Sequence, residues 1–450
     1  MPHIGAFFYL ANNYSFIRHI YYIVIHEITK VSFSHFIILS FVMFQIEYSP
    51  NLKWEIMISG SKNAALPIVA ANLCIDNKVK LINKPNIKDI VSMEHLAQTA
   101  IQKSEKYFDL TDDLAKKFRA SILLIPFWLI KYGKVKFVGS GWCNIGKRPL
   151  DTFDDALAKA GIKIKNGEFK MYEIIGKPKK NIMLQEFSVT ATEALITYLV
   201  FAKNYTYSIN IYQAAIEPHV RNLIDFLNML GANIHIHIDH SITISPSKID
   251  IAKKEFTIIG DYIEVGTYFA IWAGADESEI TIKWCDVDDL SAIYNVADKI
   301  GIDFKVLDKH TIRVSSKNKK NYTSTKFETR IFPWFPTDLQ PIFWTLLTQA
   351  KGISKIFETL YEGRFGYLNE LENLWAKIEI LNPYQAIVIW PTALRWWYVT
   401  STDLRCGGAM VLAWIMAHGT TNIMNEDIIA RGYDDIVAKL QSIWVKIKII

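Results

Sequence analysis

The chain has 450 residues, a length typical of two or three domains. Half of the residues are hydrophobic and 21% are charged, which excludes a disordered or collagen-like chain. Fifty Lys and Arg against 45 Asp and Glu leave a net charge of +5, too small an excess to indicate a nucleic-acid-binding protein. The four cysteines have no paired spacing, so the sequence predicts neither a disulfide scaffold nor a zinc knuckle, and reduced thiols fit a cytosolic protein.

Residues 1–42 differ from the rest of the chain. They are crowded with aromatic residues and Ile, and only Arg18, Glu27 and Lys30 are charged. The longest uncharged stretch, 31–46, has 16 residues, whereas a membrane-spanning helix needs about 20. No cleavage site of the A-x-A type follows it, which argues against a signal peptide. We expect residues 1–42 to be upstream sequence translated ahead of a start at Met43, with a weak membrane anchor as the alternative.

One local pattern recurs from residue 155 onward: an amphipathic helix, a single residue and a short strand in which apolar and polar residues alternate. We call the single residue between helix and strand the punctuating residue. The punctuating residues are Gly161, Gly231, Gly301, Trp375 and Trp444. Their successive spacings are 70, 70, 74 and 69 residues. Copies this regular predict repeated βα units. A sixth, degraded copy is expected near residue 91, around the helix-like segment 95–101.

The punctuating position has a conformational requirement. A helix that turns directly into a strand usually ends in the left-handed backbone region, where Gly has no Cβ penalty and Trp is a poor choice. The chain has only 21 Gly, against about 32 expected from average usage, and it has 13 Trp. We hypothesise that a codon written here as Trp is read as Gly in the native protein. The repeat itself points to Trp375 and Trp444, and the family resemblance described below adds Trp54, Trp142, Trp334, Trp390, Trp396, Trp397 and Trp414.

Short motifs follow one another along the chain. They are SGSKNAALP at 59–67, RASI at 119–122, GSGWCNIGKRPLD at 139–151, FSVTATE at 187–193, EP at 217–218, FPTDLQ at 335–340, EGRF at 362–365, TDLR at 402–405 and RGY at 431–433. In this order they resemble the UDP-N-acetylglucosamine 1-carboxyvinyltransferases, a family of enolpyruvyl transferases in the EPSP synthase superfamily. The resemblance covers about 43–450. The glycine-rich signatures of the sibling enolpyruvylshikimate-phosphate synthases are absent.

The resemblance implies a fold and a reaction. The fold is a two-domain inside-out α/β barrel of six repeated βα units, with one domain from 43–61 plus 261–450 and the other, carrying the Cys143 loop, from 62–260. The reaction moves the enolpyruvyl group of phosphoenolpyruvate to the 3′-hydroxyl of UDP-N-acetylglucosamine by addition and elimination, and releases phosphate. It is the first committed step of peptidoglycan synthesis. We expect a cytoplasmic monomer with no cofactor and no metal.

Four residues match the family's catalytic positions: Cys143, Asp338, Lys62 and Arg431. Arg148 lies close to Cys143 in the sequence, and nearby cations make a cysteine reactive. The resemblance makes Cys143 the general acid and the thiol that can attack phosphoenolpyruvate, and it makes Asp338 the base for the sugar hydroxyl. Lys62 and Arg431 would bind phosphoenolpyruvate. From the residues alone, a lone Cys is often a small buried hydrophobe and an Asp at a helix start is often only a cap.

Further residues are implied to bind the substrates. Arg364 and Arg405 would line the same cleft as an anion clamp, and Asp403 is expected to hold the arginines in place. The complete set of expected substrate-binding positions is Lys62, Asn63, Arg119, Arg148, Pro149, Leu150, Asp151, Thr152, Ser188, Val189, Asp338, Leu360, Arg364, Asp403 and Arg405.

Four positions depart from the family pattern, and one of them is Gly363, where an Asn is usual. Trp142 stands in the cysteine loop where Gly is usual, Glu186 where a Lys near the diphosphate is usual, and Tyr262 where an Arg is usual. These last three residues favour an alternative interpretation, a catalytically inactive paralogue that binds a nucleotide sugar or a protein partner. The retained Lys62 and Cys143 favour the enzyme.

Overall fold

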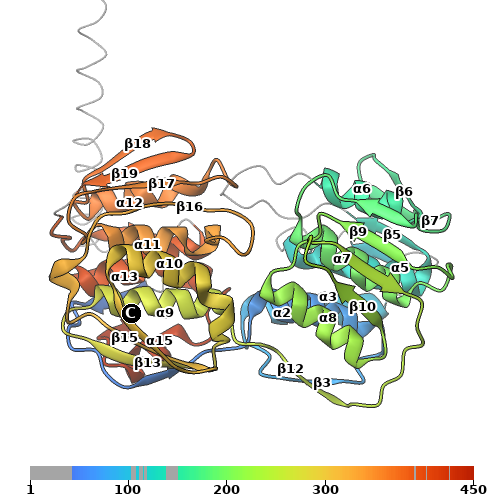
Figure 1. The fold of residues 1–450 in the computed structure, drawn as a ribbon, viewed down its shortest axis with the longest axis horizontal. Coiled ribbons are helices and arrows are strands. Elements are labelled where there is room, and N and C mark those ends of the chain that lie inside the picture. The colour runs from blue at the N-terminus through green and yellow to red at the C-terminus, as the bar shows by residue number, and fades with distance from the viewer. Residues whose placement is uncertain are drawn as a thin grey trace, which may run out of the picture. The chain divides into compact units, whose positions relative to one another are not determined.

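The computed structural model describes residues 43–102, 108–110, 115, 119–137, 150–389, 392–401, 403–424 and 426–450. The chain divides into two units, Met1–Phe41 and Val42–Ile450. The predicted extension 1–42 lies outside the described residues, and every labelled element in Figure 1 belongs to the second unit. None of the helices in the described part of the chain is long and apolar enough to cross a membrane.

The described strands form six small sheets, five with four strands and one with two. In spatial order, three sheets are β20 (Tyr398–Thr400), β21 (Thr420–Met424), β1 (Met43–Glu47) and β22 (Ile447–Ile449); β14 (Asp303–Asp308), β15 (Thr311–Ser315), β13 (Glu279–Lys283) and β2 (Glu55–Met57); and β16 (Lys326–Glu328), β17 (Ile353–Phe357), β19 (Gln385–Ile389) and β18 (Ile378–Asn382). The other three are β10 (Asn233–Ile236), β11 (Ile242–Ser245), β9 (Ile209–Tyr212) and β8 (Asn181–Met183); β4 (Phe108–Leu110), β5 (Lys134–Phe137), β7 (Lys170–Ile174) and β6 (Ile162–Lys165); and β12 (Glu255–Thr257) with β3 (Lys80–Ile82).

The buried apolar residues form two separate clusters, each with its own helices. The cluster within 64–258 includes residues of α2 (Lys62–Leu73), α3 (Lys88–Gln102), α5 (Ile125–Tyr132), α6 (Asp151–Lys159), α7 (Val189–Phe201) and α8 (Pro218–Met229). The cluster formed by 44–58 and 263–447 includes residues of α9 (Tyr262–Gly274), α10 (Ser291–Ile300), α11 (Gln340–Leu347), α12 (Leu368–Asn373), α13 (Leu404–Met416), α14 (Glu426–Ile429) and α15 (Ile436–Ser442). Each cluster is therefore built as an α/β core of its own.

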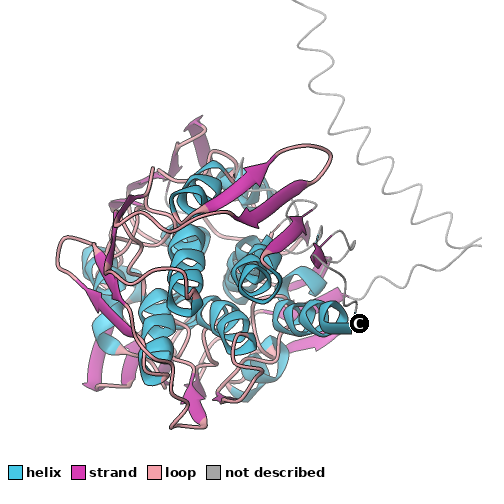
Figure 2. Cartoon of the chain, turned by 90° about the vertical axis from the view of Figure 1, so that its right-hand side faces the viewer, coloured by secondary structure: helices cyan, strands magenta, loops and turns pink. Residues whose placement is uncertain are grey.

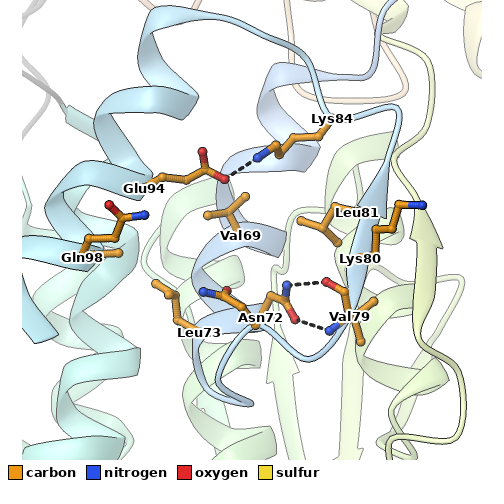
Figure 3. Close-up of a pocket in the computed structure, with 11 residues that line it drawn as sticks. Val69, Asn72, Leu73, Val79, Lys80, Leu81, Lys84, Glu94 and Gln98 are labelled. Carbon is orange, nitrogen blue, oxygen red and sulfur yellow. Dashed lines mark hydrogen bonds and ion pairs between the residues drawn. The ribbon is translucent and has the colours of Figure 1, made fainter.

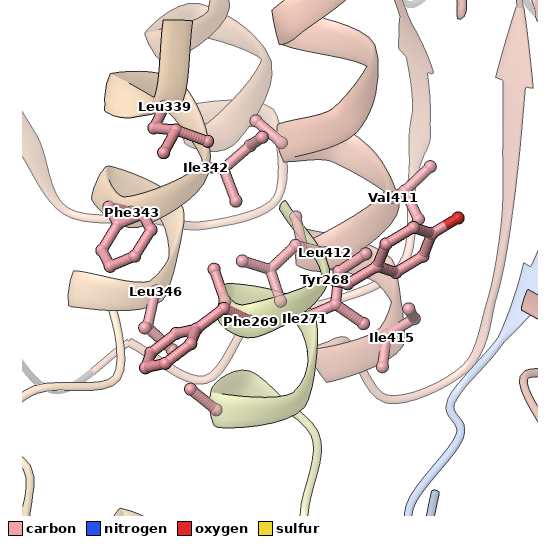
Figure 4. Packing of buried hydrophobic residues seen from close by; sticks show 14 of the residues in the cluster. Tyr268, Phe269, Ile271, Leu339, Ile342, Phe343, Leu346, Val411, Leu412 and Ile415 are labelled. Atoms are coloured by element: carbon pink, nitrogen blue, oxygen red, sulfur yellow. The ribbon is translucent and has the colours of Figure 1, made fainter. Parts of the chain in front are cut away.

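The helices lie inside and the strands outside. Every residue of α9 after Tyr262 is buried, and α13 is buried from Arg405 to Met416. A helix that is apolar all round is buried on every side. Figure 4 shows how α9, α11 and α13 meet through side chains that include Phe269, Phe343 and Leu412. In Figure 2 the strands surround the helices, as in the predicted inside-out α/β barrel.

The strands cover the helices with one face only. In β13 the buried residues alternate with partly exposed ones, and Ile282 pairs with Ile312 of β15 and with Ile56 of β2. All three side chains are buried on the core side of the sheet. Because side chains alternate across a strand, a shift of one residue would move this isoleucine row to solvent. The apolar alternation therefore fixes the register.

The predicted repeat is present at all five helix-to-strand turns. The φ angles of Gly161, Gly231 and Gly301 are +86°, +91° and +85°, and those of Trp375 and Trp444 are both +73°. At each turn the structure passes from a helix into a short strand. The predicted helix-like segment 95–101 lies within α3.

The two tryptophan turns use the same hydrogen bond as the turns at Gly231 and Gly301. The Ala376 amide donates to the Leu371 carbonyl and the Val445 amide to the Leu440 carbonyl, both at 3.0 Å. The Ile302 amide makes the same bond beyond Gly301. This is the pattern of the Schellman cap, whose left-handed residue is usually Gly. Trp375 and Trp444 therefore stand at positions with a backbone requirement for glycine.

Other tryptophans divide into two groups. Trp54 and Trp284 also have positive φ, at +90° and +67°, and both side chains are exposed. Trp414, in contrast, is buried within α13, so the left-handed argument does not extend to it. Trp142 and Trp390 lie outside the described residues.

Candidate active site

Lys62 and Asn63 are placed by the start of α2. The Ser61 hydroxyl accepts a hydrogen bond from the Ala64 amide at 3.4 Å and caps the helix. The Lys62 amide donates to Asp261 at 3.2 Å, and its ammonium lies 2.5 Å from Asp89. The Lys62 side chain is only 13% exposed. The predicted phosphoenolpyruvate lysine is therefore fixed at both its backbone and its charged end.

Arg431 approaches the same carboxylate from a distant part of the sequence. Its Nε donates to Asp89 Oδ1 at 3.0 Å. Burial lowers the pKa of Lys62, Asp89 raises it, and Arg405 and Arg431 lower it. The structure thus brings together three of the predicted cations, with Asp89 between Lys62 and Arg431.

Asp338 and two arginines form a second charged group. Arg364 Nη2 lies 2.5 Å from Asp338 Oδ1, while Arg405 donates to Oδ2 from Nε at 3.0 Å and from Nη2 at 2.9 Å. Burial raises the pKa of Asp338, but the two guanidiniums outweigh it and hold that pKa well below its usual range. Asp338 is therefore ionised at neutral pH.

Asp403 supports this group through the backbone. Its carboxylate accepts hydrogen bonds from the amides of Arg405 at 2.8 Å and Cys406 at 3.1 Å, which caps α13. The cap fixes the first turn of the helix and hence the direction from which Arg405 reaches Asp338. The wider role of Asp403 in holding both arginines stays a prediction.

Five of the positions expected to bind the nucleotide lie at helix starts. Ser188 caps α7 by accepting from the Ala191 amide at 3.4 Å, and Val189 is the first residue of that helix. Leu150 precedes α6, which starts with Asp151 and Thr152. Helix N-termini favour anions because their first amides and the helix dipole point at the ligand.

Thr152 is held by one of the residues that depart from the family pattern. Its hydroxyl donates to Glu186 Oε1 at 3.0 Å. Glu186 therefore has a structural partner of its own. Among the remaining predicted positions, Arg119 starts a short 3₁₀ helix and Leu360 is 39% exposed. Cys143, Arg148 and Pro149 lie outside the described residues and stay predictions.

A buried polar cluster lies near Asp338 and was not predicted from the sequence. The ring of His219 stacks on Tyr262, with centroids 6.4 Å apart. Burial lowers the pKa of His219 to about 4, while Asp338 opposes that shift. Burial raises the pKa of both Glu193 and Glu217. Such perturbed groups cluster at functional sites. Glu193 and Glu217 stand in the motifs FSVTATE and EP, but nothing in the sequence links them to His219.

Asp89 was also missed. An acidic residue in the first turn of a helix usually indicates only a favourable interaction with the helix dipole, and nothing in the sequence links it to Lys62 or Arg431.

A separate hollow lies between α2, α3 and β3 (Figure 3). Its volume is about 350 Å³, and none of the predicted site residues lines it. Three of its polar side chains already have partners: Lys84 pairs with Glu94, and the Asn72 amide group bonds to both backbone groups of Val79. We do not assign the site to this hollow. Within the described residues, no group of three or more His, Cys, Asp or Glu is arranged to hold a metal ion.

Comparisons with known proteins identify the family and the fold. The family model of EPSP synthase (3-phosphoshikimate 1-carboxyvinyltransferase) matches residues 46–440. The chain is 35% identical to the UDP-N-acetylglucosamine 1-carboxyvinyltransferase of Pseudothermotoga lettingae, over 88% of this chain and 96% of that protein. It is 34% identical to the enzyme of the same name from Sulfurimonas denitrificans, over 90% and 98%.

Solved structures share the fold. The enolpyruvyl transferase NikO from Streptomyces tendae superposes with a TM-score of 0.78 at 19% identity, over 91% of this chain and 99% of that chain. The EPSP synthase of Acinetobacter baumannii gives a TM-score of 0.67 at 10% identity, over 91% and 100%. At these identities the likeness shows the fold alone.

Proposed function

The chain belongs to the UDP-N-acetylglucosamine 1-carboxyvinyltransferase family, and on that premise we propose that it transfers the enolpyruvyl group of phosphoenolpyruvate to the 3′-hydroxyl of UDP-N-acetylglucosamine. Phosphate is released, in the first committed step of peptidoglycan synthesis. The observation that carries the proposal is the convergence of Lys62, Arg405 and Arg431, which pair with the carboxylates of Asp89 and Asp338. The comparisons give no support to a catalytically inactive paralogue.

The cations bind the phosphoenolpyruvate anion. Guanidinium groups fit phosphate and carboxylate oxygens in pairs, and the Lys62 ammonium adds a point charge. Lys62, Arg364 and Arg405 are largely buried, where charge interactions are screened less than in water. Arg148 from the cysteine loop completes this set.

Asp338 receives the proton of the sugar hydroxyl. With both guanidiniums in place it is a weak base, because they stabilise its ionised form. Movement of Arg405 or Arg364 toward the substrate anion would remove a hydrogen bond from Asp338 and raise its basicity. Binding of phosphoenolpyruvate would in this way prepare the base for the second substrate.

Cys143 supplies the proton to the methylene carbon of phosphoenolpyruvate. In the addition step, the sugar oxygen bonds to C2 while C3 receives that proton. In the elimination step, the Cys143 thiolate takes a proton back from C3, the C2–C3 double bond forms again, and the C2–O bond to phosphate breaks. The nucleotide is held by Arg119, Arg148 to Thr152, Ser188, Val189 and Leu360, with Asn63 on the sugar.

The proposal includes a cytoplasmic monomer that needs no metal or cofactor. The test is phosphate release on mixing the purified protein with both substrates. We expect release only when both are present, and loss of release in Cys143→Ala. Cys143→Ser keeps a side chain of similar size but replaces the thiol by a less acidic hydroxyl, so it tests whether the acidity of the thiol is needed. A well-folded protein that releases no phosphate would overturn the proposal and favour the inactive paralogue.

A further inference from the structure

Asp89 lies between two cations that the proposed function assigns to phosphoenolpyruvate. Its Oδ2 is 2.5 Å from Lys62 Nζ, and its Oδ1 accepts from Arg431 Nε at 3.0 Å. We propose that Asp89 is a positioning residue, which holds the Lys62 ammonium and the Arg431 guanidinium in register for the anionic substrate. This inference rests on the proposed function.

The contact differs from an ordinary surface ion pair. Exposed pairs such as Lys80–Glu255, with side chains 70% and 62% exposed, contribute little. The Asp89 side chain is 8% exposed and that of Lys62 is 13% exposed, so their interaction is screened less by solvent. One carboxylate faces two cations, so the local charge stays positive and still attracts an anion.

A second contact fixes the same pair of segments. The Asn86 amide, just before α3, donates to Asp434 Oδ2 at 3.1 Å. Asp434 and Arg431 lie on the segment between α14 and α15. The start of α3 therefore contacts this segment at two points, one of which does not involve Asp89. A substitution at Asp89 should therefore loosen the Lys62 and Arg431 side chains, while the contact between Asn86 and Asp434 still holds the segment between α14 and α15.

Asp89 shifts the pKa of Lys62 in the opposite direction to the other charged groups around it. Arg405 of α13 and Arg431 face Lys62, and burial adds to their effect in lowering its pKa. The Asp261 carboxylate accepts from the Lys62 backbone amide and from the amides of Ile263 and Glu264 at the start of α9. Asp89 is the carboxylate that raises the pKa of Lys62. Without it, Lys62 should lose its proton at a lower pH.

Asp89→Asn should therefore separate kcat from KM. Removal of the negative charge of Asp89 favours binding of phosphoenolpyruvate, whereas loosening of the two cations weakens it, so the change in the KM for that substrate should be small. Orientation of Lys62 is lost, and misplacement of a catalytic group by about 1 Å can cost on the order of 100-fold in rate. We expect kcat to fall between about tenfold and 100-fold, and the alkaline limb of the pH–rate profile to move to lower pH.

The experiment compares wild type, Asp89→Asn, Asp89→Glu and Glu94→Gln in phosphate release over a range of pH. Glu94 lies on the same helix and pairs with Lys84 outside the site, so its variant should match wild type (Figure 3). Asp89→Glu should recover part of kcat. An Asp89→Asn variant with the kcat and pH profile of wild type would overturn the inference.

A second measurement does not depend on turnover. The pKa of the Lys62 ammonium, followed by NMR of labelled lysine, should be lower in Asp89→Asn than in wild type. An unchanged pKa would overturn the positioning role even if the protein released no phosphate. Failure of phosphate release in wild type alone would overturn the proposed function. The two failures are therefore distinguishable.

Discussion

Arg405 donates two hydrogen bonds to a single oxygen of Asp338, from Nε at 3.0 Å and from Nη2 at 2.9 Å. Arg364 occupies the other oxygen, and its side chain is 2% exposed. The carboxylate is thus the counter-charge for two buried guanidiniums as well as the expected base. Its catalytic and structural roles cannot be changed separately by one substitution.

Asp338→Asn should reduce both stability and activity. The amide leaves two buried cations without a counter-charge, which costs about 3 kcal/mol in the free energy of unfolding. Loss of the base should lower kcat about 100-fold or more. Denaturant unfolding and phosphate release measure the two effects. Glu279→Gln is the control, since its pair with Lys317 is exposed and its loss should leave both quantities almost unchanged. Full activity in Asp338→Asn would contradict the assignment of the base.

His219 should make the protein less stable as the pH falls from about 6.5 to about 4. The pKa of the folded state is lowered to about 4 by burial, so the unfolded chain binds more protons across this window and unfolding becomes easier. A shift of this size corresponds to about 3 kcal/mol. His219→Gln should reduce the loss, as measured by the free energy of unfolding at several pH values.

Two neighbouring groups act in the opposite direction. Burial raises the pKa of Glu193 and Glu217, so their contribution to the free energy of unfolding falls as the pH rises. They are present in wild type and variant alike, and the difference between the two proteins isolates His219. His235→Gln, at an exposed position on β10, should behave as wild type. Identical acid profiles for wild type and His219→Gln would show that His219 does not titrate as a buried base.

Trp375→Gly and Trp444→Gly should each stabilise the chain as written by about 1–2 kcal/mol, because both backbones are left-handed and both side chains are exposed. Thermal or denaturant unfolding measures the gain. Gly301→Ala is the reverse control: a Cβ there would meet no atom within 4 Å, so its expected loss of stability reports the φ angle alone. Loss of stability in both tryptophan variants would argue that the indoles are native.

The same hypothesis predicts the composition of the protein from its native source. Peptides covering 54, 375 and 444 should contain glycine, and the intact mass should be lower by one Trp-to-Gly difference for each such position. A start at Met43 would remove a further block of 42 residues. A mass that matches the written chain would mean that the tryptophans are real.

Glu186→Gln should remove a negative charge from a position where the family usually has a Lys near the diphosphate. The amide keeps a partner for Thr152, now 3.0 Å from Glu186 Oε1, and removes a negative charge from the neighbourhood proposed for the diphosphate. We expect a lower KM for UDP-N-acetylglucosamine, by several-fold, with kcat unchanged. Glu173→Gln, a pair with Lys134 elsewhere in this part of the chain, is the control. A raised KM would place the diphosphate away from Glu186.

Local requirements could be predicted from the sequence. The five helix-to-strand turns follow from the spacing of Gly and Trp, because the left-handed cap is set by the sterics of one residue and by hydrogen bonds within a single turn. Caps such as Ser61 and Asp403 depend in the same way on neighbours two or three residues away. The family motifs added which of these helix starts are expected to meet a substrate.

Only the tertiary structure decided how the charges pair. Asp89 meets Arg431 across 342 positions of the sequence, and Arg405 meets Asp338 across 67. Such pairs depend on which helices pack together and on how deeply each side chain is buried. Burial sets the strength of a charge interaction and the direction of a pKa shift. The sequence by itself determined the repeat, the helix ends and the family, whereas long-range packing selected Asp89 and His219 from among many ordinary acidic and histidine residues.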